Sequence, residues 1–287
     1  MSFVELKRGD NDKKKVWGGK TPEETPLYTV TKLQNDLNSV GVYSEKIDGD
    51  FGKKTEHALK IYQWCIKNST TVLKNNALTT YVPSSSIVIS GKCDLATSAL
   101  LNDWVTKSYV VIGDLVRVDA GSLSNIEIGP GFKCIGKPIV ATSEFVISKS
   151  AYSMIKSMNA LAKKSNVVIK INQALRIYGA KVTGSVVPPA TKSQHLIGHA
   201  VDCNIVDGTS WNTASDFKKS TQTNGAKTFI NAMKKEGYRW GGDFSKVDTP
   251  HFDKQLNSSS FDYDVKFFLN QKQISSGAYI DKQIVAK

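Results

Sequence analysis

The sequence of 287 residues predicts an α+β domain with a small antiparallel sheet, preceded by a small domain of three helices. Two observations predict this order. Apolar residues recur at helical spacing through the first hundred residues, whereas later segments form short apolar runs or alternate apolar with polar residues. We place the helical domain at 1–107, a β-rich connector at 108–131 and the α+β domain at 132–287.

The helical domain begins with a clear helix pattern. Leu33, Leu37 and Val40 share one helical face, and Gly41 follows as a residue type that ends helices. After a tight turn, a second helical face covers 55–66.

A polar segment over 68–86 separates the second helix from the third. The third helix is expected over 95–104, with Asp94 as its N-cap, because an aspartate there can accept bonds from the free N–H groups of the first turn.

The α+β domain is expected to mix short strands with longer helices. We expect strands near Ile139, at Val167–Ile171 and at Val201–Ile205, and helices over about 148–164, about 217–236 and around Val265. In the strand at Val201–Ile205, apolar residues alternate with Asp202 and Asn204. Asp202 should therefore point away from the apolar face of the sheet.

Composition and charge limit the kinds of partner and the cellular location that we expect for the protein. The formal net charge of +12 favours an anionic polymer as partner, which includes nucleic acid, a lipid surface and a bacterial cell wall. Lysines occur singly or in short runs such as 13–15, without a basic helix or a Cys/His finger, so nucleic acid is not expected. No apolar run is long enough to cross a bilayer, and no secretory signal is visible at the N-terminus. We expect a monomer made in the cytoplasm without insertion in a membrane.

The four cysteines are widely separated in the sequence. They are Cys65, Cys93, Cys134 and Cys203, and no pair has the CxxC spacing of a thiolate zinc site. We expect buried thiols rather than disulfides or metal ligands.

Two distant strings contain three of the four histidines. The first runs from Ser193 to Asp202 and contains His195; the second runs from Asp248 to Phe252 and contains His251. Two imidazoles and one carboxylate are the ligand set of a catalytic zinc centre. Asp248 would supply a further carboxylate beside it.

A second arrangement of the first string is possible. On a continuous helix, His195, His199 and Asp202 would share one face. Gly198 and the β-type alternation after it favour a loop and a strand, so His199 is not expected to be a ligand.

The two strings resemble the D-Ala-D-Ala carboxypeptidase / L-alanyl-D-glutamate peptidase family of zinc peptidases, which includes phage endolysins. The similarity rests on Ser-x-His-x-x-Gly-x-Ala-x-Asp from Ser193 and on Trp-Gly-Gly-Asp-Phe…Asp-x-x-His-Phe from Trp240. The resemblance implies that Zn²⁺ is held by His195, Asp202 and His251.

The same resemblance implies roles for four further residues. Asp248 would be the general base and Arg176 would stabilise the oxyanion, while Ser193 and Trp240 would support the site or the substrate. The residues before Arg176 depart from the family, which usually has a small hydroxyl residue and an aromatic there; this chain has Gln-Ala-Leu over 173–175.

The N-terminal helices resemble the peptidoglycan-binding domain of cell-wall hydrolases. The residues that carry the resemblance are Leu33-Gln34, Leu37, Gly41, Ile47-Asp48-Gly49, Phe51-Gly52, Thr55, Ala58-Leu59 and Gln63. Two insertions, over 8–30 and 67–90, depart from that family.

These resemblances imply three candidate functions. The first is a modular endolysin that cuts the L-Ala–D-Glu bond of the peptidoglycan stem peptide, reaching the wall in the periplasm after a membrane lesion. The second is a D-Ala-D-Ala carboxypeptidase or dipeptidase. The third is a non-catalytic wall-binding or virion protein. The lack of a visible signal peptide favours the first.

Overall fold

The computed structural model describes residues 3–21, 26–132, 142–180, 191–277 and 280–283. The chain divides into two compact units, residues 1–112 and 113–287. Two sequence-based expectations, the strand near Ile139 and the state of Cys134, lie outside the described residues. No helix in the described part of the chain combines the length and apolar character needed to span a bilayer.

The first unit is largely helical. Its helices are α1 (Val30–Ser39), α2 (Lys53–Asn68) and α3 (Leu95–Thr106), and Asp94 caps α3 as predicted by accepting a bond from Thr97 N at 2.7 Å. The polar segment after α2 forms a hairpin of β1 (Thr71–Lys74) and β2 (Ala77–Thr80), and β3 (Tyr109–Val110) pairs with β1.

Two fully buried glutamines hold the loops of this unit. The Gln34 amide oxygen accepts bonds from Asp48 N and Gly49 N, and the Gln63 amide oxygen accepts bonds from Ser90 N and Gly91 N. Buried amides with this many backbone bonds fix turns. Gln34 and Gln63 therefore contribute to folding rather than to a binding surface.

The second unit contains a mixed sheet in the order β10-β11-β8-β7-β5, with β9 also paired to β8. Its strands are β5 (Ile126–Ile128), β7 (Val167–Gln173), β8 (Ala200–Asp207), β9 (Ser210–Asn212), β10 (Arg239–Trp240) and β11 (His251–Asp253). Only the pair β5–β7 is parallel, so the expected antiparallel character holds for most of this sheet.

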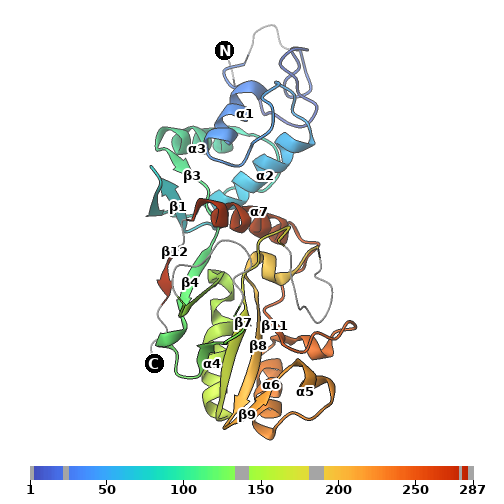
Figure 1. Ribbon diagram of the computed structural model, residues 1–287. Coiled ribbons are helices and arrows are strands. Elements are labelled where there is room, and N and C mark those ends of the chain that lie inside the picture. The colour runs from blue at the N-terminus through green and yellow to red at the C-terminus, as the bar shows by residue number, and fades with distance from the viewer. Residues whose placement is uncertain (1–2, 22–25, 133–141, 181–190, 278–279, 284–287) are drawn as a thin grey trace. The chain divides into compact units, whose positions relative to one another are not determined.

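Helices α4 (Tyr152–Lys164) and α6 (Asn224–Lys235) pack against each other and on β7 and β8 (Figure 1). Val201, Cys203 and Ile205 are buried in the same core as these helices, whereas Asp202 and Asn204 are half-buried. The predicted alternation along this strand is confirmed. It places Asp202 on the sheet face opposite the helices.

A second sheet joins β4 (Leu115–Asp119) to β6 (Glu144–Ser148) and to β12 (Ile280–Gln283). The segment 108–131 is thus shared between the units: β3 lies in the first, and β4 and β5 lie in the sheets of the second.

Two predicted helices differ in extent from those observed. The single helix expected over 217–236 is wrong, because α5 (Ala214–Lys218) ends two residues before Ser220, which has a left-handed φ of 57°, and Thr223 then caps α6. The short C-terminal helix is instead the long helix α7 (Phe261–Ser276).

Candidate metal centre

The register of the sheet brings the two histidine strings together. On neighbouring antiparallel strands, Asp202 of β8 stands directly opposite His251 of β11. Residues opposite each other in such a pair have Cβ atoms about 5 Å apart, close enough for one ion to contact both side chains. The cross-strand pairing therefore supplies two of the three predicted ligands.

His195 comes from the short 3-10 helix η3 (Gln194–Ile197), directly before β8. Ser193 caps this turn by accepting a bond from His195 N at 3.3 Å, and Gly198 ends it with a left-handed φ of 71°. A Cβ on Gly198 would lie 2.6 Å from Ser148 N, so only glycine fits there. The predicted loop before the strand is confirmed, and the alternative continuous helix is excluded.

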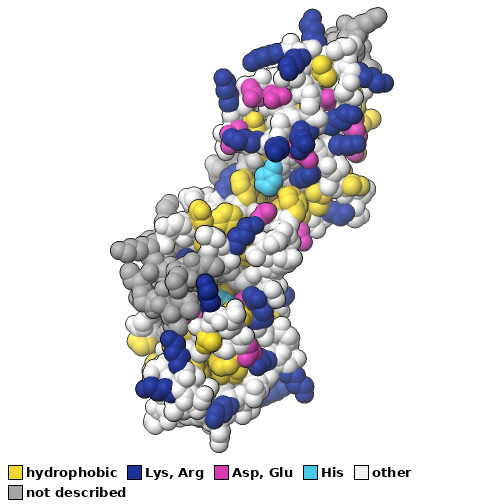
Figure 2. Space-filling view, turned by 90° about the vertical axis from the view of Figure 1, so that its right-hand side faces the viewer, with side chains coloured by type: hydrophobic (Ala, Val, Ile, Leu, Met, Phe, Trp, Pro, Cys, Tyr) yellow, Lys and Arg dark blue, Asp and Glu magenta, His cyan; other side chains and the backbone are white. Residues whose placement is uncertain are grey.

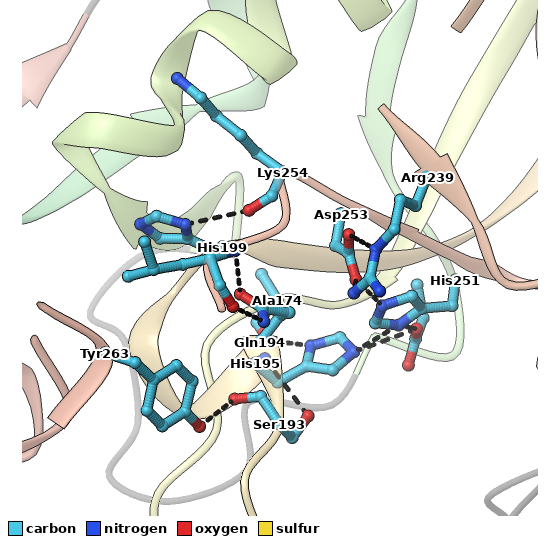
Figure 3. Close-up of polar contacts among 12 residues, drawn as sticks. Ala174, Ser193, Gln194, His195, His199, Arg239, His251, Asp253, Lys254 and Tyr263 are labelled. Atoms are coloured by element: carbon cyan, nitrogen blue, oxygen red, sulfur yellow. Dashed lines mark hydrogen bonds and ion pairs between the residues drawn. The ribbon is translucent and has the colours of Figure 1, made fainter. Parts of the chain in front are cut away.

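Three atoms converge at the centre, and Figure 3 shows the two imidazole rings, of His195 and His251, that face each other there. His195 Nε2 lies 3.2 Å from Asp202 Oδ1 and 3.1 Å from His251 Nδ1, and His251 Nδ1 lies 3.2 Å from Asp202 Oδ1. In tetrahedral zinc sites, bond lengths of about 2.0–2.2 Å place neighbouring donor atoms about 3.3–3.6 Å apart. Within the described residues this is the one group of three or more His, Cys, Asp and Glu side chains with converging ligand atoms.

The far nitrogen of each ring is occupied. His195 Nδ1 donates to the carbonyl of Ala174 at 2.6 Å, and His251 Nε2 donates to Asp253 Oδ2 at 2.9 Å. With these protons in place, the nitrogens that face the centre carry the lone pairs that a metal needs. Two lone pairs and a carboxylate oxygen repel one another unless a cation lies between them, so the donor set fits a zinc ion.

The electrostatics of the cluster agree with this interpretation. Burial opposes charge on His251, but bonds to Asp202 and Asp253 raise the pKa of its ring to about 9, so at pH 7 a zinc ion would have to displace a proton from Nδ1. Burial likewise disfavours the charged form of Asp202, yet the two imidazoles hold the pKa of its carboxyl well below the usual range. The site thus attracts positive charge strongly.

His199 lies away from this cluster (Figure 3). Its Nδ1 donates to the carbonyl of Lys254 at 3.0 Å, and its Nε2 is 2.8 Å from the hydroxyl of Ser150. Burial and the charge of Lys266 lower the pKa of this ring to about 4, so it is neutral at pH 7. Both ring nitrogens are occupied by hydrogen bonds, which agrees with its expected absence from the ligand set.

Asp248 lies at the start of the turn that leads into β11. Its carbonyl accepts a bond from His251 N, and its amide donates to Gly241 O at 2.8 Å. Its half-buried carboxyl interacts electrostatically with Asp202, both ligand imidazoles and Arg176. Burial and the negative charge of Asp202 raise the pKa of Asp248 above the usual value.

Trp240 supports the same turn. Its indole N–H donates to the carbonyl of Thr249 at 2.8 Å, and its ring packs edge-on against Phe217. A Cβ on Gly242 would lie 2.2 Å from the Trp240 ring, so glycine is required where the chain crosses the indole. These contacts favour support of the turn over direct contact with substrate.

Arg176 lies three residues beyond the end of β7, and its amide donates to the carbonyl of His195 at 3.0 Å. Its side chain is only 6% exposed, and none of the described residues accepts a hydrogen bond from its guanidinium. Burial lowers the pKa of this group, while the charges of Asp202 and Asp248 act in the opposite direction. Donors that bond to none of the described residues are available for an anionic ligand.

Sequence reasoning missed the residues that lie behind His251, which are Asp253, Arg239 and Phe244. Asp253 is fully buried and receives two bonds from the Arg239 guanidinium, at 2.8 and 2.6 Å, besides the one from His251. The Phe244 ring lies against both partners of Asp253. Its centre is 4.9 Å from the guanidinium carbon of Arg239 and 5.6 Å from the centre of the His251 ring. The signal was present in the alternation of β11, because residues two apart on a strand share a face.

Comparisons with known proteins agree with both halves of the chain. Residues 188–254 match the family model described as D-alanyl-D-alanine carboxypeptidase, and residues 28–64 match the model described as a peptidoglycan binding domain. A comparison with curated proteins found no match. The first matched segment contains all three converging ligands and Asp248, whereas Arg176 lies before it. Residues 188–254 are therefore similar to peptidases of the D-alanyl-D-alanine carboxypeptidase type and residues 28–64 to a peptidoglycan-binding domain, and the two matches together support a cell-wall metallopeptidase acting on peptidoglycan.

Proposed function

We propose that this protein is a modular endolysin that uses zinc to hydrolyse the L-Ala–D-Glu bond of the peptidoglycan stem peptide. The observation that carries the zinc-dependent activity is the convergence of His195 Nε2, Asp202 Oδ1 and His251 Nδ1 within 3.2 Å of one another. The choice of bond is supported by the resemblance of the two histidine strings to the L-alanyl-D-glutamate peptidases. The peptidoglycan-binding segment supports the wall as the place of action.

His195, Asp202 and His251 would hold the zinc ion. When bound, zinc supplies a Lewis acid that polarises the scissile carbonyl and makes water more acidic. With three protein ligands, the ion would remain open to the scissile carbonyl or to water, as in other catalytic zinc sites.

Asp248 would act as the general base. Its carboxylate is in electrostatic contact with the ligand cluster without belonging to it. A carboxylate there would accept a proton from the attacking water and return it to the leaving amine. Its raised pKa makes it a stronger base than an exposed aspartate.

Arg176 would bind the oxygen of the scissile carbonyl as negative charge develops on it. The Arg176 side chain is 6% exposed, and none of the described residues accepts a hydrogen bond from its guanidinium, so its donors would be available when that charge appears. Removal of a single oxyanion donor costs about 100- to 1,000-fold in turnover in well-studied hydrolases.

A second candidate, a D-Ala-D-Ala carboxypeptidase or dipeptidase, is favoured by the description of the family model that matches residues 188–254. The metal centre would serve either reaction. The two reactions differ in which peptide bond of the substrate lies at the metal centre.

Digestion of purified sacculi tests these candidates. We expect clearing that a chelator abolishes and added zinc restores, and mass analysis should show peptides with a new N-terminal D-Glu while L-Ala stays on the glycan. Release of free D-Ala alone would support the carboxypeptidase. Wall binding without any released product would contradict both enzymes and favour the virion protein.

A further inference from the structure

The segment that carries Arg176 leaves the sheet before the arginine is reached. Strand β7 ends at Gln173, and the following residues reach Tyr178 without joining a named strand. The amide of Arg176 bonds to the carbonyl of His195, which leaves the Arg176 carbonyl and the amide of the exposed Tyr178 for other partners. The carbonyl of the buried Arg176 requires a partner.

Gln271 of helix α7 supplies both partners. Its side-chain Nε2 donates to the carbonyl of Arg176 at 3.0 Å, and its Oε1 accepts from the amide of Tyr178 at 2.8 Å. One residue of a neighbouring parallel strand would contact these groups in the same way, through its own N–H and C=O. The side chain of Gln271 thus makes the contacts that one residue of such a strand would make.

The second N–H of the same amide reaches the other half of the site. Gln271 Nε2 also donates to the carbonyl of Leu196 at 2.6 Å, within the turn η3 that carries His195. The end of the Gln271 amide that faces two carbonyls must be the nitrogen, and the end that faces the Tyr178 N–H must be the oxygen. Both N–H groups and the carbonyl oxygen are used, so one side chain joins the Arg176 segment to the His195 turn.

We propose that Gln271 is a positioning residue that holds the Arg176 guanidinium at the reaction centre. Helix α7 lies beyond the segment that matches the carboxypeptidase model, so the match says nothing of Gln271. The inference rests on the proposed role of Arg176 at the oxyanion.

The same helix provides a matched control. Two residues along, Gln273 makes the same kind of contact, accepting from Leu115 N at 2.8 Å and donating to Leu115 O at 3.2 Å. Those bonds reach β4 and do not touch Arg176 or η3. Removing either side chain loosens α7, but only the loss of Gln271 removes bonds from the arginine segment and from η3, while the bond from Arg176 N to the carbonyl of His195 remains.

The test compares Gln271→Ala, Gln271→Glu and Gln273→Ala in the full chain, with a synthetic soluble stem pentapeptide that contains both candidate scissile bonds. The glutamate variant keeps the acceptor for Tyr178 but cannot donate to the carbonyls of Arg176 and Leu196 when ionised. We expect both Gln271 variants to lower kcat by about 10- to 100-fold with KM and zinc content unchanged, because misplacement by about 1 Å has this cost. We expect Gln273→Ala to lower Tm and retain kcat.

A double-mutant cycle with Arg176→Ala shows whether the effect passes through the arginine. We expect Gln271→Ala to lower kcat no further in the Arg176→Ala background. A further fall of the same size there, a wild-type kcat for Gln271→Ala, or an equal loss in Gln273→Ala would overturn the inference. An inactive or chelator-insensitive wild-type protein would instead overturn the proposed function.

Discussion

Asp253 divides its hydrogen bonds between a ligand imidazole and the Arg239 guanidinium, and it has no contact with solvent. Burial raises its pKa, but its bonds to His251 and Arg239 outweigh burial and lower it. The residue therefore stays ionised and orients the His251 ring with its Nδ1 lone pair toward the centre. Carboxylates in this position raise the basicity of a metal-binding histidine.

We expect Asp253→Asn to weaken zinc binding by about 10- to 100-fold, the usual cost of losing such a partner. The affinity can be measured by competition with a chromogenic chelator. Asp264→Asn is the matched control, because it removes a carboxylate from an exposed pair with Lys192 and should leave zinc affinity unchanged. Equal affinity in all three proteins would show that Asp253 has no influence on the metal.

For Asp248 we expect a loss of activity without a loss of zinc affinity. The Asp248→Ala variant should bind zinc with wild-type affinity and lose activity by about 100- to 10,000-fold, because the general base is removed while the ligands remain. Asp243→Ala, which removes a surface carboxylate paired with Lys234 in the same loop, should retain activity. Loss of zinc from Asp248→Ala would make Asp248 a ligand and contradict its assignment as the base.

At the scale of elements, the turn η3 and strand β8 are joined by one glycine. Gly198 has a φ of 71°, and a Cβ there would lie 2.6 Å from Ser148 N and 3.1 Å from the carbonyl carbon of Ile147. Gly208, in the hairpin after β8, has a similar φ of 59°, but a Cβ at that position would have nothing within 4 Å. The two positions share the backbone strain and differ only in crowding.

We expect Gly208→Ala to cost about 1–2 kcal/mol, the strain of a left-handed alanine. Gly198→Ala should cost more, since β6 must move away, and it should also weaken zinc binding by displacing His195. Urea denaturation and the chelator competition measure the two effects. Equal destabilisation of the two variants, with unchanged zinc affinity, would mean that the close approach of Gly198 to β6 has no role.

Sequence reasoning selected three residues that converge in the structure, because the donor atoms that a zinc ion requires can be inferred from residue type and spacing. His195, Asp202 and His251 were predicted from two short strings, and the alternation around Val201 gave the correct face of β8. The pairing of Asp202 with His251 was not predictable from spacing, because it depends on the register between strands 49 residues apart. The role of Gln271 was hidden for the same reason: its contacts join residues up to 95 positions apart.

The predicted helix boundaries were wrong where a turn depended on residues that also occur in exposed helices. The break between α5 and α6 rests on Ser220 in a left-handed conformation and on the cap at Thr223, and a run of polar residues there is compatible with an exposed helix as well as a turn. The length of α7 depends on Asn270, Gln271 and Gln273, whose amides bond to distant backbone groups. Polar residues that are buried for such reasons lower the apparent periodicity of a helix.

At the scale of the whole molecule, charge is unevenly divided. Residues 1–112 contain 15 Lys and Arg against 12 Asp and Glu, whereas residues 113–287 contain 23 against 14. Helices α4 and α6 together carry six exposed lysines and no acidic residue: Lys156, Lys163, Lys164, Lys227, Lys234 and Lys235. On the face shown in Figure 2, Lys and Arg side chains are scattered over the lower half rather than gathered in one patch.

A scattered excess of positive charge acts at long range rather than by specific contacts. Such attraction to an anionic wall weakens as salt shortens the screening length from about 10 Å at 0.1 M to about 3 Å at 1 M. We therefore expect the clearing of sacculi to slow over this range, while hydrolysis of a soluble stem peptide without net charge continues at a constant rate. The soluble peptide serves as the control for effects of salt on the metal centre or on stability. If salt slowed both reactions equally, the charge of the second unit would have no part in bringing the enzyme to the wall.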